Sequence, residues 1–295
     1  MLEIRLAQQG ETALQKELWK RCFGDSDRYI DFYYANRYKE DETVVLLHDG
    51  EISAMLTMLP VRTVLPDNRS FKTAMLYAIA TNPDYQNLGF ATKLMDFSNQ
   101  YLRIQKTELS VLTPANGHLF DYYRKLGYQD GFDIREAQLL RASIESLAGD
   151  QACQCTVSAI TPHEYNRRRN KQLDGRLCIA YSDEDIAYQK KLSQLSGVDI
   201  YAVDIDEIQG CFVVERITSD KVLIKEILLP EELMNVALKQ ISQQLSAQEY
   251  VLRTPYYLGK HLGGRLRPFG MIRVDRKIDW VITSEELGYL GLAFD

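Results

Sequence analysis

The segment Tyr77-Ala-Ile-Ala-Thr-Asn-Pro-Asp-Tyr-Gln-Asn-Leu-Gly-Phe-Ala-Thr-Lys-Leu-Met95 decides the expected fold. Its first residues are apolar and typical of a strand, which ends at Asn82-Pro83. After a short turn, a helix is expected to open on residues 86–89. The first turn of a helix has backbone N–H groups without partners inside the helix, and the helix dipole makes this end positive. Gly89 lets the backbone approach an anion closely, because no Cβ stands in the way. The segment therefore predicts a turn that binds a pyrophosphate or a similar anion.

A glycine early in a helix also serves close packing, so this segment alone leaves both interpretations open. The residues that follow narrow the choice. Apolar side chains continue at helical spacing after Ala91, and residues 108–113 then indicate a short buried strand. Residues 114–117 break that strand, and a second helix ends at Gly127, where a glycine cap is expected.

In this order the residues resemble the GCN5-related N-acetyltransferases (the GNAT superfamily), which bind acetyl-CoA and acylate amines. The family's Gln/Arg-x-x-Gly-x-Gly/Ala turn is present as Gln86-Asn-Leu-Gly89-Phe-Ala91, preceded by the typical Asn82-Pro83. Its Tyr-x-Lys-x-Gly-Phe/Tyr pattern is present as Tyr123-Arg-Lys-Leu-Gly127-Tyr128. The match covers roughly residues 1–140. It implies an α+β (mixed α/β) fold in which helices flank a twisted, mostly antiparallel sheet.

The same resemblance implies acetyl-CoA as the cosubstrate and assigns residues to it. Backbone groups of Ile79 and Thr81 would pair with the pantetheine arm, and N–H groups of residues 87–92 would hold the pyrophosphate. The coenzyme residues implied in this way are Ile79, Ala80, Thr81, Gln86, Asn87, Leu88, Gly89, Phe90, Ala91, Thr92 and Asn116.

Tyr123 is the expected general acid that protonates the departing thiolate. A phenol with a pKa near 10 stays protonated at neutral pH and can donate. The alternative is that Tyr123 only packs in the core. Tyr122 is expected to face another way, since neighbours on a helix do not share a face.

The rest of the first half fits the same plan. Residues 2–6 alternate like a strand, and residues 12–38 are helical with a break at Gly24-Asp25. Further strands are expected at residues 44–47, 52–59, 61–65 and 72–81, the first two joined by a turn at Asp49-Gly50.

Beyond a polar linker near residues 148–151, the order of elements repeats. Strands are expected at residues 178–181, 199–203, 211–217, 222–229 and 250–254, and helices at residues 182–195 and 230–245. The last of these helices begins with Pro230-Glu231-Glu232-Leu233, which has one donor fewer and no glycine. Each carboxylate favours the helix by about 0.3–1 kcal/mol and disfavours phosphate. We therefore expect one coenzyme site, in an acetyltransferase domain at residues 1–145. A degenerate GNAT-like domain at residues 152–280 and a tail at residues 281–295 follow.

An active and a degenerate acetyltransferase domain in tandem resemble the enhanced intracellular survival (Eis-like) acetyltransferases. These usually carry a third, sterol-carrier-like domain, which this chain is expected to lack, although Arg267–Arg273 is similar to its beginning. In Eis-like enzymes the general base is the terminal carboxylate, which implies Asp295 here. The apolar tail Gly288–Asp295 is expected to dock, and the alternative is a packed or frayed terminus.

Composition excludes several other classes. With 45% hydrophobic and 26% charged residues, no apolar leader and no run of membrane-spanning length, the chain is expected to be a soluble protein without a membrane role. Five scattered cysteines argue against a disulfide framework and favour a cytoplasmic location. Four histidines, none near a cysteine pair, predict no metal site.

The net charge of −6 argues against nucleic acid as a partner and suits an amine-bearing acceptor. Arg167-Arg168-Arg169 is the only basic cluster and follows the capping-box pattern Thr161-Pro-His-Glu164. It is therefore interpreted as a solvated helix face.

Three classes of function remain. The leading hypothesis is an N-acetyltransferase that moves an acetyl group from acetyl-CoA to a primary amine of a small molecule, peptide or lysine, by direct attack in a ternary complex. The alternative is a non-catalytic acyl-CoA-binding sensor or scaffold, and the third class is an interaction protein that binds no coenzyme. The sequence does not encode the acceptor, and it leaves the oligomeric state open.

Overall fold

The computed structural model describes residues 1–148, 153–276, 278–280 and 287–294. The chain divides into two compact units. Unit 1 comprises Met1–Arg62, Phe71–Gln129 and Met271–Val281, and unit 2 comprises Thr63–Ser70, Asp130–Gly270 and Ile282–Asp295. Both units are built from segments that are not consecutive in the chain.

The sheet of unit 1 has the strand order β1-β2-β3-β4-β5-β13. Its strands are β1 (Leu2–Leu6), β2 (Thr43–His48), β3 (Glu51–Val64), β4 (Ser70–Thr81), β5 (Leu109–Leu112) and the end of β13 (Arg265–Val274). The β1–β2, β2–β3 and β5–β13 pairs are antiparallel, and β4 runs parallel to β5. This is the mixed, mostly antiparallel sheet that the sequence predicts.

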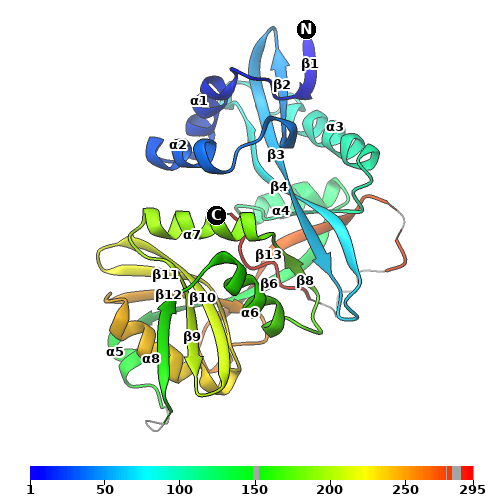
Figure 1. Ribbon diagram of the computed structural model, residues 1–295. Coiled ribbons are helices and arrows are strands. Elements are labelled where there is room, and N and C mark those ends of the chain that lie inside the picture. The colour runs from blue at the N-terminus through cyan, green and yellow to red at the C-terminus, as the bar shows by residue number, and fades with distance from the viewer. Residues whose placement is uncertain (149–152, 277, 281–286, 295) are drawn as a thin grey trace. The chain divides into compact units, whose positions relative to one another are not determined.

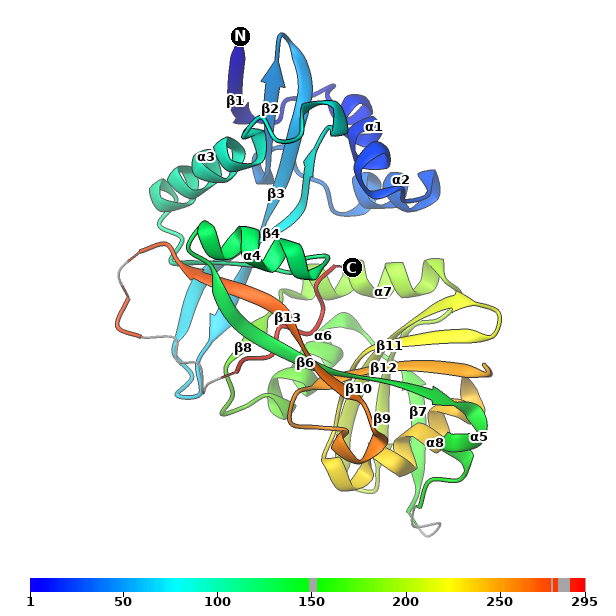
Figure 2. The same cartoon turned by 180° about the vertical axis from the view of Figure 1, so that it is seen from behind.

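Helices cover both faces of this sheet (Figure 1). One face carries α1 (Thr12–Phe23) and α2 (Asp27–Asn36), and the other carries α3 (Phe90–Ile104) and α4 (Gly117–Lys125) (Figure 2). The predicted break between α1 and α2 is confirmed, because Gly24 is left-handed with φ 72° and the Ser26 side chain caps α2. Alternate residues of β2, such as Val44 and Leu46, join the apolar cluster beneath α3 and α4.

Two of the expected strands form one continuous strand. β3 runs through Pro60, where separate strands at residues 52–59 and 61–65 were predicted. Pairing with β2 ends at Thr43 and Thr57, so the missing N–H of Pro60 lies beyond that ladder and breaks no bond to it.

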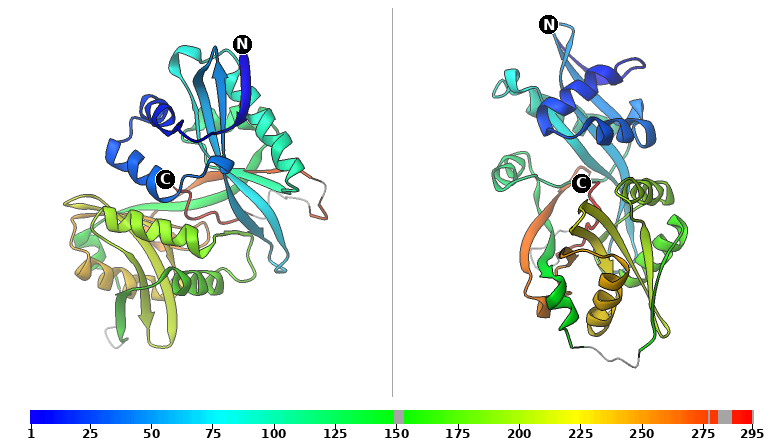
Figure 3. Two further views of the ribbon diagram at one scale, coloured as in Figure 1. Left: turned by 45° about the horizontal axis from the view of Figure 1, so that its top comes forward. Right: turned by 90° about the vertical axis from the view of Figure 1, so that its left-hand side faces the viewer.

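The sheet of unit 2 has the strand order β7-β9-β10-β11-β12-β6-β13. Its strands are β7 (Cys155–Ala159), β9 (Ile200–Ile205), β10 (Ile208–Thr218), β11 (Lys221–Leu228), β12 (Glu249–Pro255), β6 (Gln129–Leu140) and the first part of β13. One face carries α6 (Pro162–Gln172) and α7 (Asp183–Leu195). The other carries α8 (Met234–Gln244) and the short α5 (Arg141–Glu145) (Figure 3). A short strand, β8 (Cys178–Ala180), pairs with β3.

The repeat of elements expected in the second half is present. β7, β9, β10, β11 and β12 follow the order of β1 to β5, and β11 pairs with β12 in parallel, as β4 does with β5. The sixth strands are exchanged: β5 pairs with β13 from the end of the chain, and β12 pairs with β6, which follows α4. Arg267–Arg273 lies within β13, so the similarity of these residues to a third domain was misleading.

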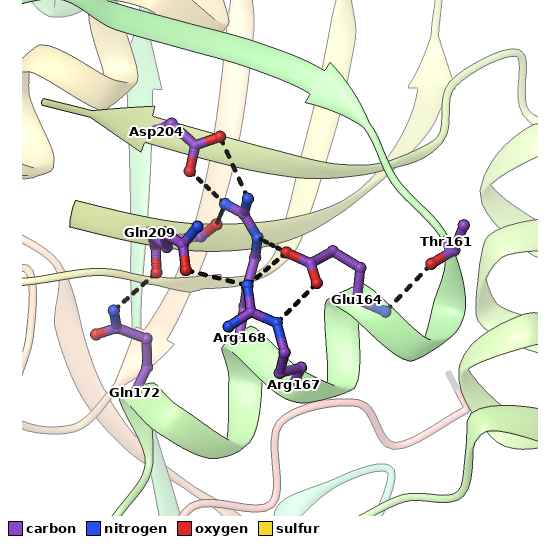
Figure 4. Close-up of polar contacts among 8 residues, drawn as sticks. Thr161, Glu164, Arg167, Arg168, Gln172, Asp204 and Gln209 are labelled. Carbon is purple, nitrogen blue, oxygen red and sulfur yellow. Dashed lines mark hydrogen bonds and ion pairs between the residues drawn. The ribbon is translucent and has the colours of Figure 1, made fainter. Parts of the chain in front are cut away.

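The arginine cluster on α6 is a solvated face only at Arg167, which is exposed, so the prediction was wrong for the other two arginines. Arg168 and Arg169 are buried. Arg168 donates to Glu164 at 2.7 Å and reaches Asp204 on β9, while Arg167 also binds Glu164 (Figure 4). The Thr161 side chain caps this helix by accepting from the Glu164 N–H at 3.2 Å. All three arginines are paired with carboxylates of unit 2.

The tail at residues 287–294 is packed inside unit 2, which is the packed terminus that the sequence left open as an alternative. Tyr289, Leu290, Leu292 and Phe294 are each no more than 1% exposed. The backbone N–H of Tyr289 donates to the Leu177 carbonyl at 2.9 Å. Nearby, Arg169 forms a fully buried ion pair with Glu226 at 2.9 Å and also donates to the Leu290 carbonyl.

All five cysteines are free thiols. In the described part of the chain, no helix is long and apolar enough to cross a membrane.

Candidate active site

β4 loses its neighbour on one side before it ends. Its parallel pairing with β5 runs from Thr73 opposite Leu109 to Leu76 opposite Leu112, where β5 stops. β4 continues to Thr81, so its last residues extend past the end of β5. The predicted residues Ile79, Ala80 and Thr81 lie on this extension.

A backbone kink marks the point where the two strands part. Ala78 has a positive φ of 49°, which costs a residue with a Cβ about 1–2 kcal/mol. Beyond it, the Asn82 N–H donates to the Ser53 carbonyl at 2.9 Å, and the Cys22 thiol donates to the Thr81 carbonyl at 3.3 Å. The end of β4 is therefore anchored to β3 and α1 on the side away from β5. No pattern in the sequence indicated the strained alanine.

The turn after β4 is built differently from the prediction. A short 3-10 helix at Pro83–Tyr85 is capped by the Asn82 side chain, which accepts from the Asp84 N–H at 3.1 Å. α3 begins at Phe90 and not on residues 86–89, because Asn87 and Gly89 are left-handed, with φ 65° and 77°. A right-handed helix cannot include them.

This turn presents a row of unused donors. The first helical bond of α3 runs from the Lys93 N–H to the Gly89 carbonyl at 3.1 Å. The N–H groups of residues 87–92 donate to no other residue in the described ranges. A Cβ built on Gly89 would meet nothing within 4 Å, so the space above the turn is open. Such an arrangement, with N–H groups at a helix start next to left-handed residues, suits an anion.

Three rings hold the turn in place. The Phe90 side chain is 5% exposed and lies 5.4 Å from the His48 ring and 5.8 Å from the Tyr85 ring, measured between centroids. His48 lies at the end of β2. The side chain of Phe90 therefore belongs to the core, while its backbone belongs to the donor row.

α4 carries the predicted acid. Tyr123 is the buried residue of this helix, 6% exposed, with its ring 5.1 Å from Tyr122 and 5.9 Å from Tyr128. Burial raises the pKa of Tyr123 well above its ordinary value, and the neighbouring tyrosines add a smaller effect in the same direction. Its hydroxyl makes no hydrogen bond with any residue that the structure describes. The phenol is thus kept neutral and has a proton to give.

Tyr122 was missed. It does not face away: its hydroxyl lies 3.3 Å from the Thr92 Oγ1, which joins α4 to the first turn of α3. This contact could not be predicted from the spacing of residues on one helix, because the contact depends on how α3 and α4 pack.

The predicted residues come together only in part. Ile79, Phe90 and Tyr123 share one apolar cluster, which links the end of β4, the start of α3 and α4. Asn116 caps α4 by accepting from the Leu119 N–H at 3.2 Å, so its side-chain oxygen is already used. Asp295 lies outside the described residues. The described residues contain no group of three or more side chains able to hold a metal ion.

The corresponding turn of unit 2 is closed. Glu231 accepts from the Gly259 N–H at 2.6 Å and binds His261 at 2.7 Å. These bonds tie the start of the α8 segment to the loop that follows β12. A carboxylate of the chain thus lies beside the end of β12, and the turn has neither a glycine nor a left-handed residue.

Solved structures with this fold are known. A GCN5-related N-acetyltransferase from Anabaena variabilis matches with a TM-score of 0.73 and 16% identity, over 94% of this chain and 73% of that one. A probable N-acyltransferase from Enterococcus faecalis matches with a TM-score of 0.72 and 14% identity, over 93% and 73%. Eis1 from Mycobacterium abscessus matches with a TM-score of 0.66 and 12% identity, over 93% and 74%.

These likenesses confirm the predicted fold class. Among curated proteins no match was found. The family model described as the acetyltransferase (GNAT) domain matches residues 3–130, which include the β4 extension, the donor row and α4. Residues 3–130 are therefore an acetyltransferase domain of the GNAT superfamily.

Proposed function

We propose that this protein transfers an acetyl group from acetyl-CoA to a primary amine of a small molecule, peptide or lysine side chain, by direct attack in a ternary complex. The observation that carries the proposal is the donor row at residues 87–92, open above Gly89, which follows the part of β4 that extends past β5. A pyrophosphate suits the row, because its charge would meet several N–H groups at once. The backbone of Ile79–Thr81 would then hold the pantetheine arm beside it.

Tyr123 is the proposed general acid. When bound, acetyl-CoA supplies an acyl group on a thioester, and its thiolate must be protonated as it departs. The raised pKa of Tyr123 keeps its phenol protonated, and its hydroxyl is not engaged by another described residue.

The general base is proposed to be the terminal carboxylate of Asp295, as the Eis-like resemblance implies. Deleting the last residues would not test this, because Ala293 and Phe294 are buried and their loss would unfold the tail. Adding two glycines after Asp295 moves the terminal carboxylate while keeping Phe294. We expect kcat to fall at neutral pH in that variant, whereas Asp295→Asn, which keeps the terminal carboxylate, should remain active. Full activity of the extended chain would contradict the role.

One coenzyme site per chain is proposed, with unit 2 as the degenerate copy. Acetyl-CoA titration by calorimetry should give one equivalent, and release of free thiol with a panel of amines should identify the acceptor. Binding without thiol release for every amine would favour the sensor or scaffold. No heat of binding would contradict the proposed function altogether.

A further inference from the structure

Two adjoining hollows in unit 2 share Arg176 and Tyr257. The first is lined also by Pro66, Tyr256 and Tyr289, among others. The second is lined also by Leu228, Leu229, Pro230 and Leu258, among others. Every lining residue belongs to unit 2.

The second hollow lies where the sheet of unit 2 opens. The parallel pairing of β11 with β12 ends at Ile224 and Leu252, while β11 continues to Leu228. Leu228–Pro230 follows the end of one parted strand, and Tyr257-Leu258 follows the end of the other. Ligands commonly bind at the carboxyl ends of parted parallel strands.

The character of this opening differs from that of unit 1. Glu231 occupies the Gly259 N–H with its own carboxylate, and this negative charge disfavours a pyrophosphate. What remains is apolar and aromatic, and its charged group is Arg176. A ligand rich in phosphate is therefore disfavoured here.

Arg176 is an exposed cation that has no counter-ion among the described residues. Its guanidinium carbon lies 3.7 Å from the centroid of the Tyr257 ring, a stacked position. The Arg176 side chain makes no hydrogen bond or ion pair with any residue in the described ranges, including nearby Asp174. Arg167, Arg168 and Arg169, by contrast, are each paired with a carboxylate.

The walls suit a planar or apolar body. Burial raises the pKa of Tyr257 to about 12, so its phenol stays neutral and does not repel an anion. Tyr289 is 1% exposed. Glu226 lies near the Tyr289 hydroxyl but not in hydrogen-bonding geometry. No other described residue forms a hydrogen bond with this hydroxyl. A guanidinium fork next to tyrosine rings matches a carboxylate joined to a flat group.

We propose that unit 2 binds a small organic carboxylate, with Arg176 holding the carboxylate and the tyrosines of the two hollows packing against its body. This site is separate from the coenzyme site proposed in unit 1 and does not depend on it.

The probe is benzoate, and benzamide is its neutral counterpart of the same shape. Binding to the full chain is followed by ligand-observed NMR titration. We expect saturable benzoate binding in the millimolar range and much weaker binding of benzamide. Arg176→Gln should weaken benzoate binding by about tenfold, the effect of losing a charge-assisted contact. Arg167→Gln removes an equally exposed charge from the same unit and should leave binding unchanged.

Benzoate should bind equally well in the Gly89→Ala variant and in the presence of saturating acetyl-CoA. Loss of binding under either condition would place benzoate at the coenzyme turn and overturn the proposal. So would equal affinities for benzoate and benzamide, an Arg176→Gln variant that binds like the parent, or no saturable binding.

Discussion

At the scale of single residues, Ala78 and Gly89 stand out because both are left-handed and both border the same stretch of backbone. Glycine adopts this conformation freely, but alanine does not. The strain at Ala78 is placed where β4 parts from β5, and such strain is typical of functional sites. Gly89 keeps the turn open without that cost.

Gly89→Ala should weaken acetyl-CoA binding by about tenfold or more, because the left-handed conformation costs alanine about 1–2 kcal/mol and the donor row would shift. Calorimetry measures the affinity. Gly24→Ala is a matched control: Gly24 has φ 72° and ψ 13°, against 77° and 13° at Gly89, and a Cβ meets nothing within 4 Å at either position. It should lower stability comparably and leave the affinity intact. Equal losses in the two variants would speak against a coenzyme role for the turn.

Tyr123→Phe should lower kcat by about 10²-fold or more while leaving the Kd for acetyl-CoA nearly unchanged. Because the pKa of Tyr123 is raised, its phenol should stay protonated, and kcat should show no fall from its ionisation below about pH 10. Tyr128→Phe is the control. It is equally buried, but its hydroxyl bonds to Ser110 at 2.9 Å, so its loss should affect stability and not turnover. Unchanged turnover in Tyr123→Phe would remove the acid from the mechanism.

At the scale of elements, sequence patterns correctly predicted the turns and breaks that depend on the conformational preferences of a few neighbouring residues. The break at Gly24 and the hairpin at Asp49-Gly50 both follow from the conformations that these residues favour. The start of α3 was misplaced because Asn87 tolerates a left-handed conformation without requiring it. Nothing in the sequence around Asn87 distinguishes a helical residue from a turn residue.

Contacts between distant residues were beyond the reach of such patterns. Arg168 and Arg169 are buried because strands 36 and 57 residues away bring Asp204 and Glu226 beside them. A run of three arginines on a polar helix carries no sign of those partners. The contact between Tyr122 and Thr92 was missed for the same reason, since it spans 30 residues.

The cluster on α6 should give the protein an acid-sensitive element. The Arg167 and Arg168 guanidinium groups hold the pKa of Glu164 down to about 2. The stability that this carboxylate contributes is therefore complete above about pH 4.5 and is lost as the pH falls toward 2. Glu164→Gln should be less stable than the parent by about 1 kcal/mol at pH 7, given partial exposure, with the gap closing below pH 3.

Urea unfolding at several pH values measures that gap. Glu207→Gln removes an exposed carboxylate from the turn between β9 and β10, which has no ion pair within the described residues. The Glu207→Gln variant should have the same free energy of unfolding as the parent at every pH. A gap for Glu164→Gln that stays constant with pH would refute the role of the ion pairs.

At the scale of the whole molecule, the exchange of sixth strands was not predictable. Either β6 or β13 could pair with β5, because each is a strand of suitable length, and a strand's own sequence does not name its partner. In unit 1 that partner is residues 271–274. The acetyltransferase domain proposed at residues 1–145 would therefore contain β5 without its neighbour.

A fragment of residues 1–145 should not fold cooperatively when produced alone. The fragment lacks Met271 and the strand that pairs with β5 in the structure, so β5 would be left as an exposed edge or would pair non-natively with β6. We expect aggregation in size-exclusion chromatography and a broad thermal transition by circular dichroism. Co-expression with residues 146–295 should restore a sharp transition. A monomeric fragment with a sharp transition of its own would show that β13 is dispensable.

The late position of β13 also matters while the protein is being made. β5 leaves the ribosome long before β13 does, and at typical elongation rates the interval is on the order of 10 s. During that time the nascent first half holds an unpaired strand beside a partly built core, a species that chaperones recognise. Unit 1 is thus completed only by a strand made about 150 residues after β5.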